Sequence, residues 1–166
     1  ADLTSVTIDG AGATDTLTIT TGNADLTGAT LSNLESLTHS ATTGNITFTV
    51  NDTHLAAFTS VTTAGATGTI SAGADTTVDL TGVATATNVT TASSTGTNTT
   101  FTVDDANLSA FSVFTSGGTA GVISAGADTT VDLTNIATAT NITTASSTGA
   151  DTTFTVDDAN LSAFSV

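Results

Sequence analysis

The sequence predicts an all-β protein, a parallel β-solenoid (β-helix) built from 53-residue repeats with about two coils per repeat. The first observation is internal repetition. Residues 70–113 and 123–166 are 44 residues each, are offset by 53, and differ at five positions. The second is a series of short strand-like runs about 8–12 residues apart, separated by small and turn-forming residues. So regular a period indicates that each unit lies in an environment made by its neighbours, as in a solenoid.

The whole chain, residues 1–166, is expected to form one solenoid segment. The approximate repeat units are 1–67, which is diverged and partial, 68–120, and 121–166, which is truncated. The diverged unit contains NITFTVNDTHLAAFTSV, which places Phe48 53 residues before Phe101, just as Phe101 lies 53 residues before Phe154. We expect these phenylalanines to share one apolar core and, at two coils per repeat, to lie roughly 10 Å apart along the axis.

Strand-like runs follow one another in a fixed order within a unit. In the middle unit they lie at residues 69–71, 77–80, 88–91, 101–103 and 112–115. Apolar residues alternate with threonine in the fourth run, so Phe101 and Val103 are expected to face inward and Thr102 outward.

A short helical turn is expected after this run, over residues 106–111. Aspartate is a favoured residue at the start of a helix, so Asp104 and Asp105 are expected to cap the turn. Leu108 and Phe111 are three residues apart and would therefore lie on one face of it, toward the core.

Charge limits what this protein binds. The chain has 15 acidic residues and neither lysine nor arginine, so its net charge is −15. Nucleic acid is excluded as a partner because phosphate binding depends on lysine and arginine, and anionic membrane surfaces are disfavoured for the same reason. No apolar run approaches roughly 18 residues, so no membrane insertion is expected. Stacked aspartates within about a Debye length of one another are expected to repel and so raise their pKa values.

Aspartates in the turns form the candidate metal site. They are first of all turn caps, but hard cations such as Ca²⁺ also take carboxylate oxygens. The stretch SAGADTTVDL, at residues 71–80 and 124–133, resembles the glycine-aspartate nonapeptide of RTX toxins and adhesins. It departs from that pattern because single matches stand 53 residues apart instead of stacking consecutively. The candidate Ca²⁺ ligands are Asp75, Asp104, Asp105, Asp128, Asp157 and Asp158.

No enzymatic activity is expected. The aspartate pairs recur at solenoid spacing without a repeated histidine, lysine, arginine or tyrosine partner for acid–base chemistry. His39 and His54 do not recur in the later units and are expected at the surface.

The segments LSNLESL and FTVxDxxLxAF, together with the absence of lysine, arginine and cysteine, resemble repeat regions of large bacterial surface proteins of the S-layer and RTX-adhesin type. This resemblance implies a parallel β-solenoid outside the cell, at the cell surface. It also implies a structural or adhesive role in a surface layer, a filament or an adhesin stalk. It carries no catalytic residue.

Self-association is the expected partner interaction. Both ends of the sequence fall inside a repeat unit and lack a polar capping sequence, so we expect end-to-end association or membership of a longer chain. Two other functions remain open. One is a carbohydrate-active or carbohydrate-binding β-helix, and the other is an ice-binding solenoid, suggested by T-x-T patterns such as TLTIT and TFTV.

Overall fold

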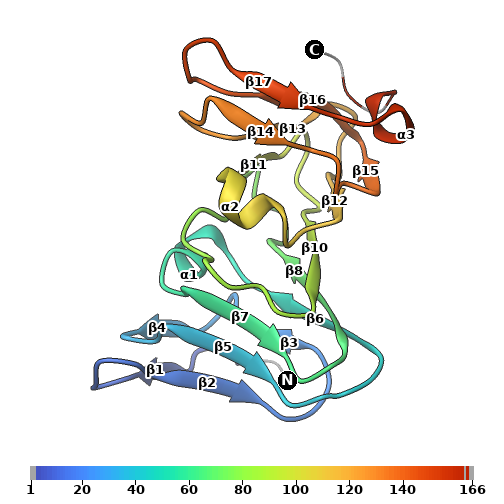
Figure 1. The fold of residues 1–166 in the computed structure, drawn as a ribbon. Coiled ribbons are helices and arrows are strands. Elements are labelled where there is room, and N and C mark those ends of the chain that lie inside the picture. Colours follow the sequence, from blue (N-terminus) through green and yellow to red (C-terminus); the bar gives the residue numbers. More distant parts are fainter. Residues whose placement is uncertain (1–2, 163, 165–166) are drawn as a thin grey trace.

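The chain forms a three-sided parallel β-solenoid, seen in Figure 1 as a stack of coils between the two termini. The computed structural model describes residues 3–162 and 164. Within this part, every pair of strands is parallel. Leu17 lies opposite Leu37 and Phe114 lies opposite Ala139, so one coil takes between 20 and 25 residues. The predicted all-β solenoid is therefore confirmed.

Face A is the longest continuous sheet, with six strands in the order β15-β12-β10-β8-β6-β3. Apolar residues alternate with threonine or serine along its strands, so one side faces the core and the other faces solvent. In the last coil the helix α3 (Asp158–Leu161) lies beside the end of this face (Figure 1). The strands are β3 (Ala24–Asp25), β6 (Asn45–Thr49), β8 (Thr67–Ser71), β10 (Val89–Ser93), β12 (Val113–Thr115) and β15 (Thr138–Thr140).

Face B is interrupted by the helix α1 (Asp52–Leu55), which takes the place of one strand. On one side of α1, His54 reaches the carbonyl oxygen of Ala29, next to β4, at 3.0 Å. On the other side, α1 contacts β9. The strands of this face are β1 (Thr7–Asp9), β4 (Thr30–Ser32), β9 (Thr77–Asp79), β11 (Thr100–Thr102), β13 (Gly121–Ser124) and β16 (Ile142–Ser146).

Face C is interrupted in the same way, but at a different height. In the coil after β7, this face has only a single bridge, which joins Thr85 to Ser60 of β7. In the following coil the helix α2 (Asp105–Leu108) takes the place of a strand and contacts β14. None of the helices in the described part of the chain is long or apolar enough to cross a membrane. The strands are β2 (Thr16–Ile19), β5 (Ser36–His39), β7 (Ser60–Thr63), β14 (Thr130–Asp132) and β17 (Thr153–Thr155).

Successive repeats are rotated by one face, because the repeat has seven sides and the solenoid has three. The chain visits faces B, C and A in turn, and the described residues complete seven coils. One repeat of seven sides therefore spans two and one third coils. The equivalent elements are β1, β7 and β12; β2, β8 and β13; β3, β9 and β14; β4, the Thr85 bridge and β15; β5, β10 and β16; β6, β11 and β17; and α1, α2 and α3.

Equivalent residues consequently lie on different faces. Phe48 belongs to β6 on face A, Phe101 to β11 on face B, and Phe154 to β17 on face C. The expected spacing of roughly 10 Å along the axis agrees with two and one third coils, which span about 11 Å. These residues do not stack directly above one another, however, because 53 residues are not a whole number of coils. The expectation of a single core is confirmed, since Phe48 and Phe101 are buried in one cluster and Phe154 packs against it.

The core consists of side chains whose size changes from coil to coil. Phe114 lies opposite Ala92 in one neighbouring coil and Ala139 in the other, so its ring fills the space that the two small residues leave. Its ring centroid is 5.4 Å from that of Phe101 and 5.8 Å from that of Phe111, and the Phe101 ring meets it edge to face. These contacts join faces A and B in the middle of the solenoid.

Polar side chains tie consecutive coils together at the corners. Asn88 and Asn141 adopt positive φ angles of 61° and 57°, a conformation that asparagine tolerates better than most residues. Each donates its Nδ2 hydrogen at 2.9 Å to a carbonyl oxygen one coil earlier, Thr63 and Ser116 respectively. Because these bonds recur at equivalent positions, they help to fix the register between coils.

Candidate functional site

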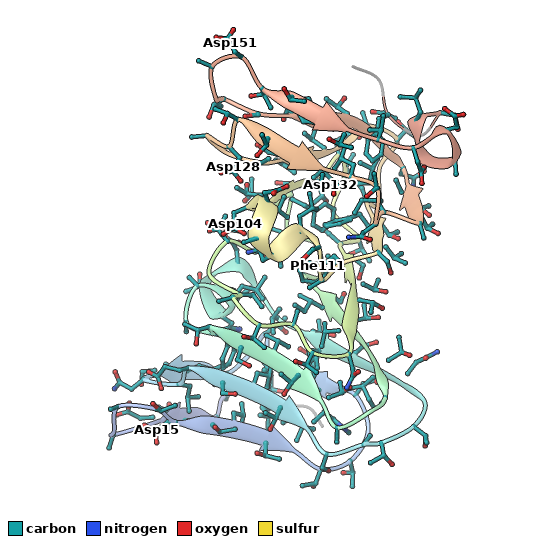
Figure 2. All side chains as sticks on the ribbon, viewed as in Figure 1. Asp15, Asp104, Phe111, Asp128, Asp132 and Asp151 are labelled. Carbon is teal, nitrogen blue, oxygen red and sulfur yellow. The ribbon has the colours of Figure 1, made fainter. Side chains whose placement is uncertain are left out.

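The predicted aspartate caps gather where α2 meets β14, as Figure 2 shows for Asp104, Asp128 and Asp132. Asp104 is the N-cap of α2, and its Oδ1 accepts the backbone N–H of Asn107 at 2.7 Å. Asn107 completes a capping box, because its Oδ1 accepts the backbone N–H of Asp104 at 3.1 Å. The predicted cap is confirmed for Asp104, whereas Asp105 is the first residue of the helix, which ends at Leu108 and not at residue 111.

Two further carboxylates join α2 to the following coil. The backbone N–H of Asp105 donates to Oδ2 of Asp128 at 2.8 Å, and the backbone N–H of Asp132 donates to Oδ1 of Asp105 at 2.8 Å. A helix cannot continue the ladder of backbone hydrogen bonds that a strand would make here. The side chains of Asp105 and Asp128 therefore supply the acceptors that the backbone N–H groups at this junction need.

The same junction occurs one repeat earlier, between α1 and β9. The N–H of Asp52 donates to Oδ2 of Asp75 at 3.0 Å, and the N–H of Asp79 donates to Oδ1 of Asp52 at 2.6 Å. The part played by Asp79 and Asp132 was not among the candidates from sequence. The segment DTTVD could have identified this role, because it places one aspartate before a short strand and another at the last residue of that strand.

The structure separates the six predicted Ca²⁺ ligands into three places. Asp75 lies beside α1, and Asp104, Asp105 and Asp128 lie together at α2. Asp157 and Asp158 are exposed at α3, where the carbonyl oxygen of Asp157 accepts the N–H of Leu161 at 3.0 Å. In residues 3–162 and 164, no group of three or more histidine, aspartate or glutamate side chains is arranged to hold a metal ion. Calcium binding stays a prediction.

Hydrogen bonds lower the pKa of three carboxyl groups below the ordinary value of 3.8, namely Asp9, Asp25 and Asp132. At Asp9 the main cause is the hydroxyl of Ser32, which donates at 2.6 Å. At the other two, the threonine two residues later donates both its hydroxyl and its backbone N–H. The expected rise in pKa through mutual repulsion is wrong for these groups, because nearby donors favour the charged form.

His39 and His54 are buried, with 2% and 6% of their surface exposed, so their expected surface position is wrong. Nδ1 of His39 accepts the N–H of Ala41 at 3.0 Å, and its Nε2 then donates to the carbonyl oxygen of Gly22 at 2.8 Å. His54 takes the place that Asn107 has in α2. Both side chains point inward because each donates to a carbonyl oxygen of the preceding coil.

Face A carries two parallel rows of outward side chains that are mostly hydroxyls. The rows are about 6.6 Å apart along a strand, and neighbouring strands are about 4.8 Å apart, so the hydroxyls form a regular grid. The first row is Thr47, Thr69, Thr91, Val113 and Thr138, and the second is Asp25, Thr49, Ser71, Ser93, Thr115 and Thr140.

An apolar hollow of about 270 Å³ opens at the C-terminal end of the solenoid. The strands at this end, β15, β16 and β17, each pair on one side only within the described sheets. Leu161 is 44% exposed there. The hollow is lined by Leu133, Ala145, Phe154, Val156, Leu161 and Phe164.

Comparison with known proteins identifies no relative. No protein-family model, curated protein or solved structure matches this chain. The junctions between coils, the hydroxyl grid and the apolar end are therefore the features from which function is inferred.

Proposed function

We propose that this chain is a non-catalytic structural module that assembles outside the cell, in a filament, a surface layer or an adhesin stalk. The observation that carries this proposal is the recurring junction between coils. The bonds among Asp105, Asp128 and Asp132 repeat those among Asp52, Asp75 and Asp79, although α2 and α1 lie on different faces.

Such junctions suit a load-bearing or spacing role because the same contacts extend the molecule without a new kind of interface. Each coil contacts only its neighbours and adds about 4.8 Å of length. The outward side chains on face A are mostly small and polar, and the net charge of −15 opposes lateral aggregation of the modules. The resemblance of the repeats to S-layer and RTX-adhesin regions supports a place at the cell surface.

Light scattering and negative-stain electron microscopy over a concentration series test this proposal. We expect linear particles whose length grows with concentration while their width stays constant. A monomer at every soluble concentration would contradict self-assembly of the module.

Ice binding is a second candidate function, favoured by the hydroxyl grid on face A. A regular array of hydroxyls can hold a layer of water in a matching order, whereas a charged, bulky side chain would disrupt that layer. The test is ice recrystallisation with Thr69→Lys or Thr91→Lys on face A. Thr102→Lys, an outward strand position on face B, is the matched control. Ice binding predicts inhibition by the native chain and by the control, and its loss in the face A variants. No inhibition by the native chain would rule the function out.

A further inference from the structure

We propose that the apolar hollow at the C-terminal end receives the first coil of a second copy of this chain. The copies join head to tail, and β1 of the second copy pairs with β16 of the first. This inference rests on the assembly proposed above, and it names the partner and the register of the joint.

Residues equivalent to those around the hollow are covered by the next coil in the middle of the chain. Phe101 and Leu108 are both 0% exposed, and β13 pairs with β11 directly over Phe101. One repeat later, within the same fifteen-residue sequence, Phe154 is only half-buried and Leu161 is 44% exposed. The sequence is unchanged, so the difference comes from the coil that would lie on top.

The first coil offers the side chains that such a cover needs. Ile8 in β1 and Leu17 in β2 are half-buried, whereas their equivalents Phe114 and Ile123 are 0% and 1% exposed. β12, the equivalent of β1, pairs with β10, the equivalent of β16. Transferring this pairing to the joint places Ile8 over Ala145.

The register of the joint follows from the pairings inside the chain. On face B, β1 pairs with β16 as β12 pairs with β10, and on face C, β2 pairs with β17 as β13 pairs with β11. Inward residues then meet inward residues on both faces. The expected partners are Thr7 with Thr144, Ile8 with Ala145, Asp9 with Ser146, and Leu17 with Phe154.

Asp25 gives the second copy a backbone N–H group that can donate a hydrogen bond to α3 of the first copy. Its Oδ1 accepts the N–H and the hydroxyl of Thr27 at 3.0 and 2.7 Å, in the same turn that Asp79 and Asp132 make. The backbone N–H groups of Asp79 and Asp132 donate to the first aspartate of the helix beneath them. At the joint, the N–H of Asp25 is therefore placed to donate to Asp158.

After three repeats, each rotated by one of the three faces, equivalent elements lie on the same face again, and this happens at the joint. Three repeats of seven sides complete seven coils, so α3 ends on face A and the next element belongs on face B. That is the face on which β1 lies. Each added copy lengthens the particle by about 34 Å, since seven coils each contribute about 4.8 Å.

One short segment is present twice at the joint. The N–H of Val6 donates to the carbonyl oxygen of Leu3 at 3.3 Å, as that of Phe164 donates to Leu161 at 3.3 Å. Leu3 and Val6 of the second copy and Leu161 and Phe164 of the first therefore compete for one place. Val6 is 39% exposed, so its segment is the one displaced.

Disulfide trapping tests the register, because the native chain has no cysteine. Neighbouring strands about 4.8 Å apart fall within the Cα separation of roughly 4.4–6.8 Å that a disulfide needs. The variant carrying Asp9→Cys and Ser146→Cys is expected to form disulfide-linked linear multimers on mild oxidation. Asp9→Cys with Ser93→Cys, a position already paired on both sides, is the matched control and should not form them.

The outcomes separate this joint from assembly in general. Light-scattering association without disulfide multimers in the first variant would overturn the register and leave the structural function standing. Disulfide dimers of the single variant Asp9→Cys would show head-to-head contact and also overturn it. No association at all would overturn both proposals.

A pair of charge substitutions gives an independent test. Leu161→Asp and Val6→Asp make the same change at the two large apolar side chains exposed in the described part of the chain. Leu161→Asp should weaken association about tenfold or more, because it buries a carboxylate in the apolar joint. Val6→Asp should leave association unchanged, because its segment is displaced. Equal weakening by both would indicate a general apolar contact and overturn the joint.

Discussion

The identical segments at residues 99–113 and 152–166 allow the stabilising effect of one coil to be measured directly. Leu108→Ala and Leu161→Ala make the same change in the same local sequence. Leu108 is 0% exposed, with a further coil above it, whereas Leu161 is 44% exposed. Replacing a buried leucine by alanine costs about 2–5 kcal/mol, which includes the cavity left behind. At Leu161 only about half of the side chain is buried and no closed cavity forms, so the cost should be about 1 kcal/mol.

Urea unfolding followed by circular dichroism, at a concentration too low for association, measures both costs. Amide hydrogen exchange on the same variants shows whether the solenoid opens coil by coil from its ends or as one unit. We expect Leu108→Ala to cost at least about 1–2 kcal/mol more than Leu161→Ala. Equal costs would show that the overlying coil does not stabilise this residue, and would refute the account of the end surface given above.

Three further measurements test the interior, the carboxylates and calcium. Gly96→Ala should cost about 1–3 kcal/mol or more in unfolding free energy, because its Cβ would overlap the carbonyl oxygen of Asp75. An unchanged urea midpoint would show that the backbone at this corner moves to make room. The lowered pKa values of Asp9, Asp25 and Asp132 favour the fold above pH 3.8, and this contribution is lost as the pH falls through their folded values. The urea midpoint should therefore decrease when the pH is lowered below 3.8. An increase of the midpoint at acidic pH would mean that repulsion between carboxylates dominates. Millimolar CaCl₂ should raise the melting temperature above that in NaCl of equal ionic strength, and equal temperatures would leave the aspartates as helix caps only.

The sequence predicts the fold class and the individual elements well, because both depend on local patterns. Alternation of apolar residues with threonine identifies Phe101 and Val103 as inward, and both are buried. The aspartate before a short apolar turn identifies α2 and its N-cap. These features depend on neighbours in the chain, and the repeats show each of them more than once.

The arrangement of the elements in space was harder to predict because a period does not reveal the number of sides per coil. Five strand-like runs and one helical turn can be counted in the middle unit of the sequence, and the seventh side appears only in the structure, as the bridge at Thr85. The pairing of Phe48 with Ile70 then shows that a coil takes 22 residues at this point. The burial of His39 and His54 was missed for a related reason. Each histidine donates to a carbonyl oxygen of another coil, and such a partner cannot be identified before the coil length is known.

The rotation of one face per repeat also explains how so acidic a chain can stack without basic residues. A repeat of six sides would place every helix and its aspartates on one face, roughly 10 Å apart along the axis. That spacing is about one Debye length at 0.1 M salt, so the carboxylates would repel one another along the whole column. With seven sides, α1, α2 and α3 lie on faces B, C and A instead. Equivalent clusters would then return to one face only after seven coils, about 34 Å away, where salt screens them. The seven-sided unit thus keeps equivalent aspartate clusters apart. At Asp9 and Asp132, side-chain hydrogen bonds are the main cause of the lowered pKa, which agrees with this separation.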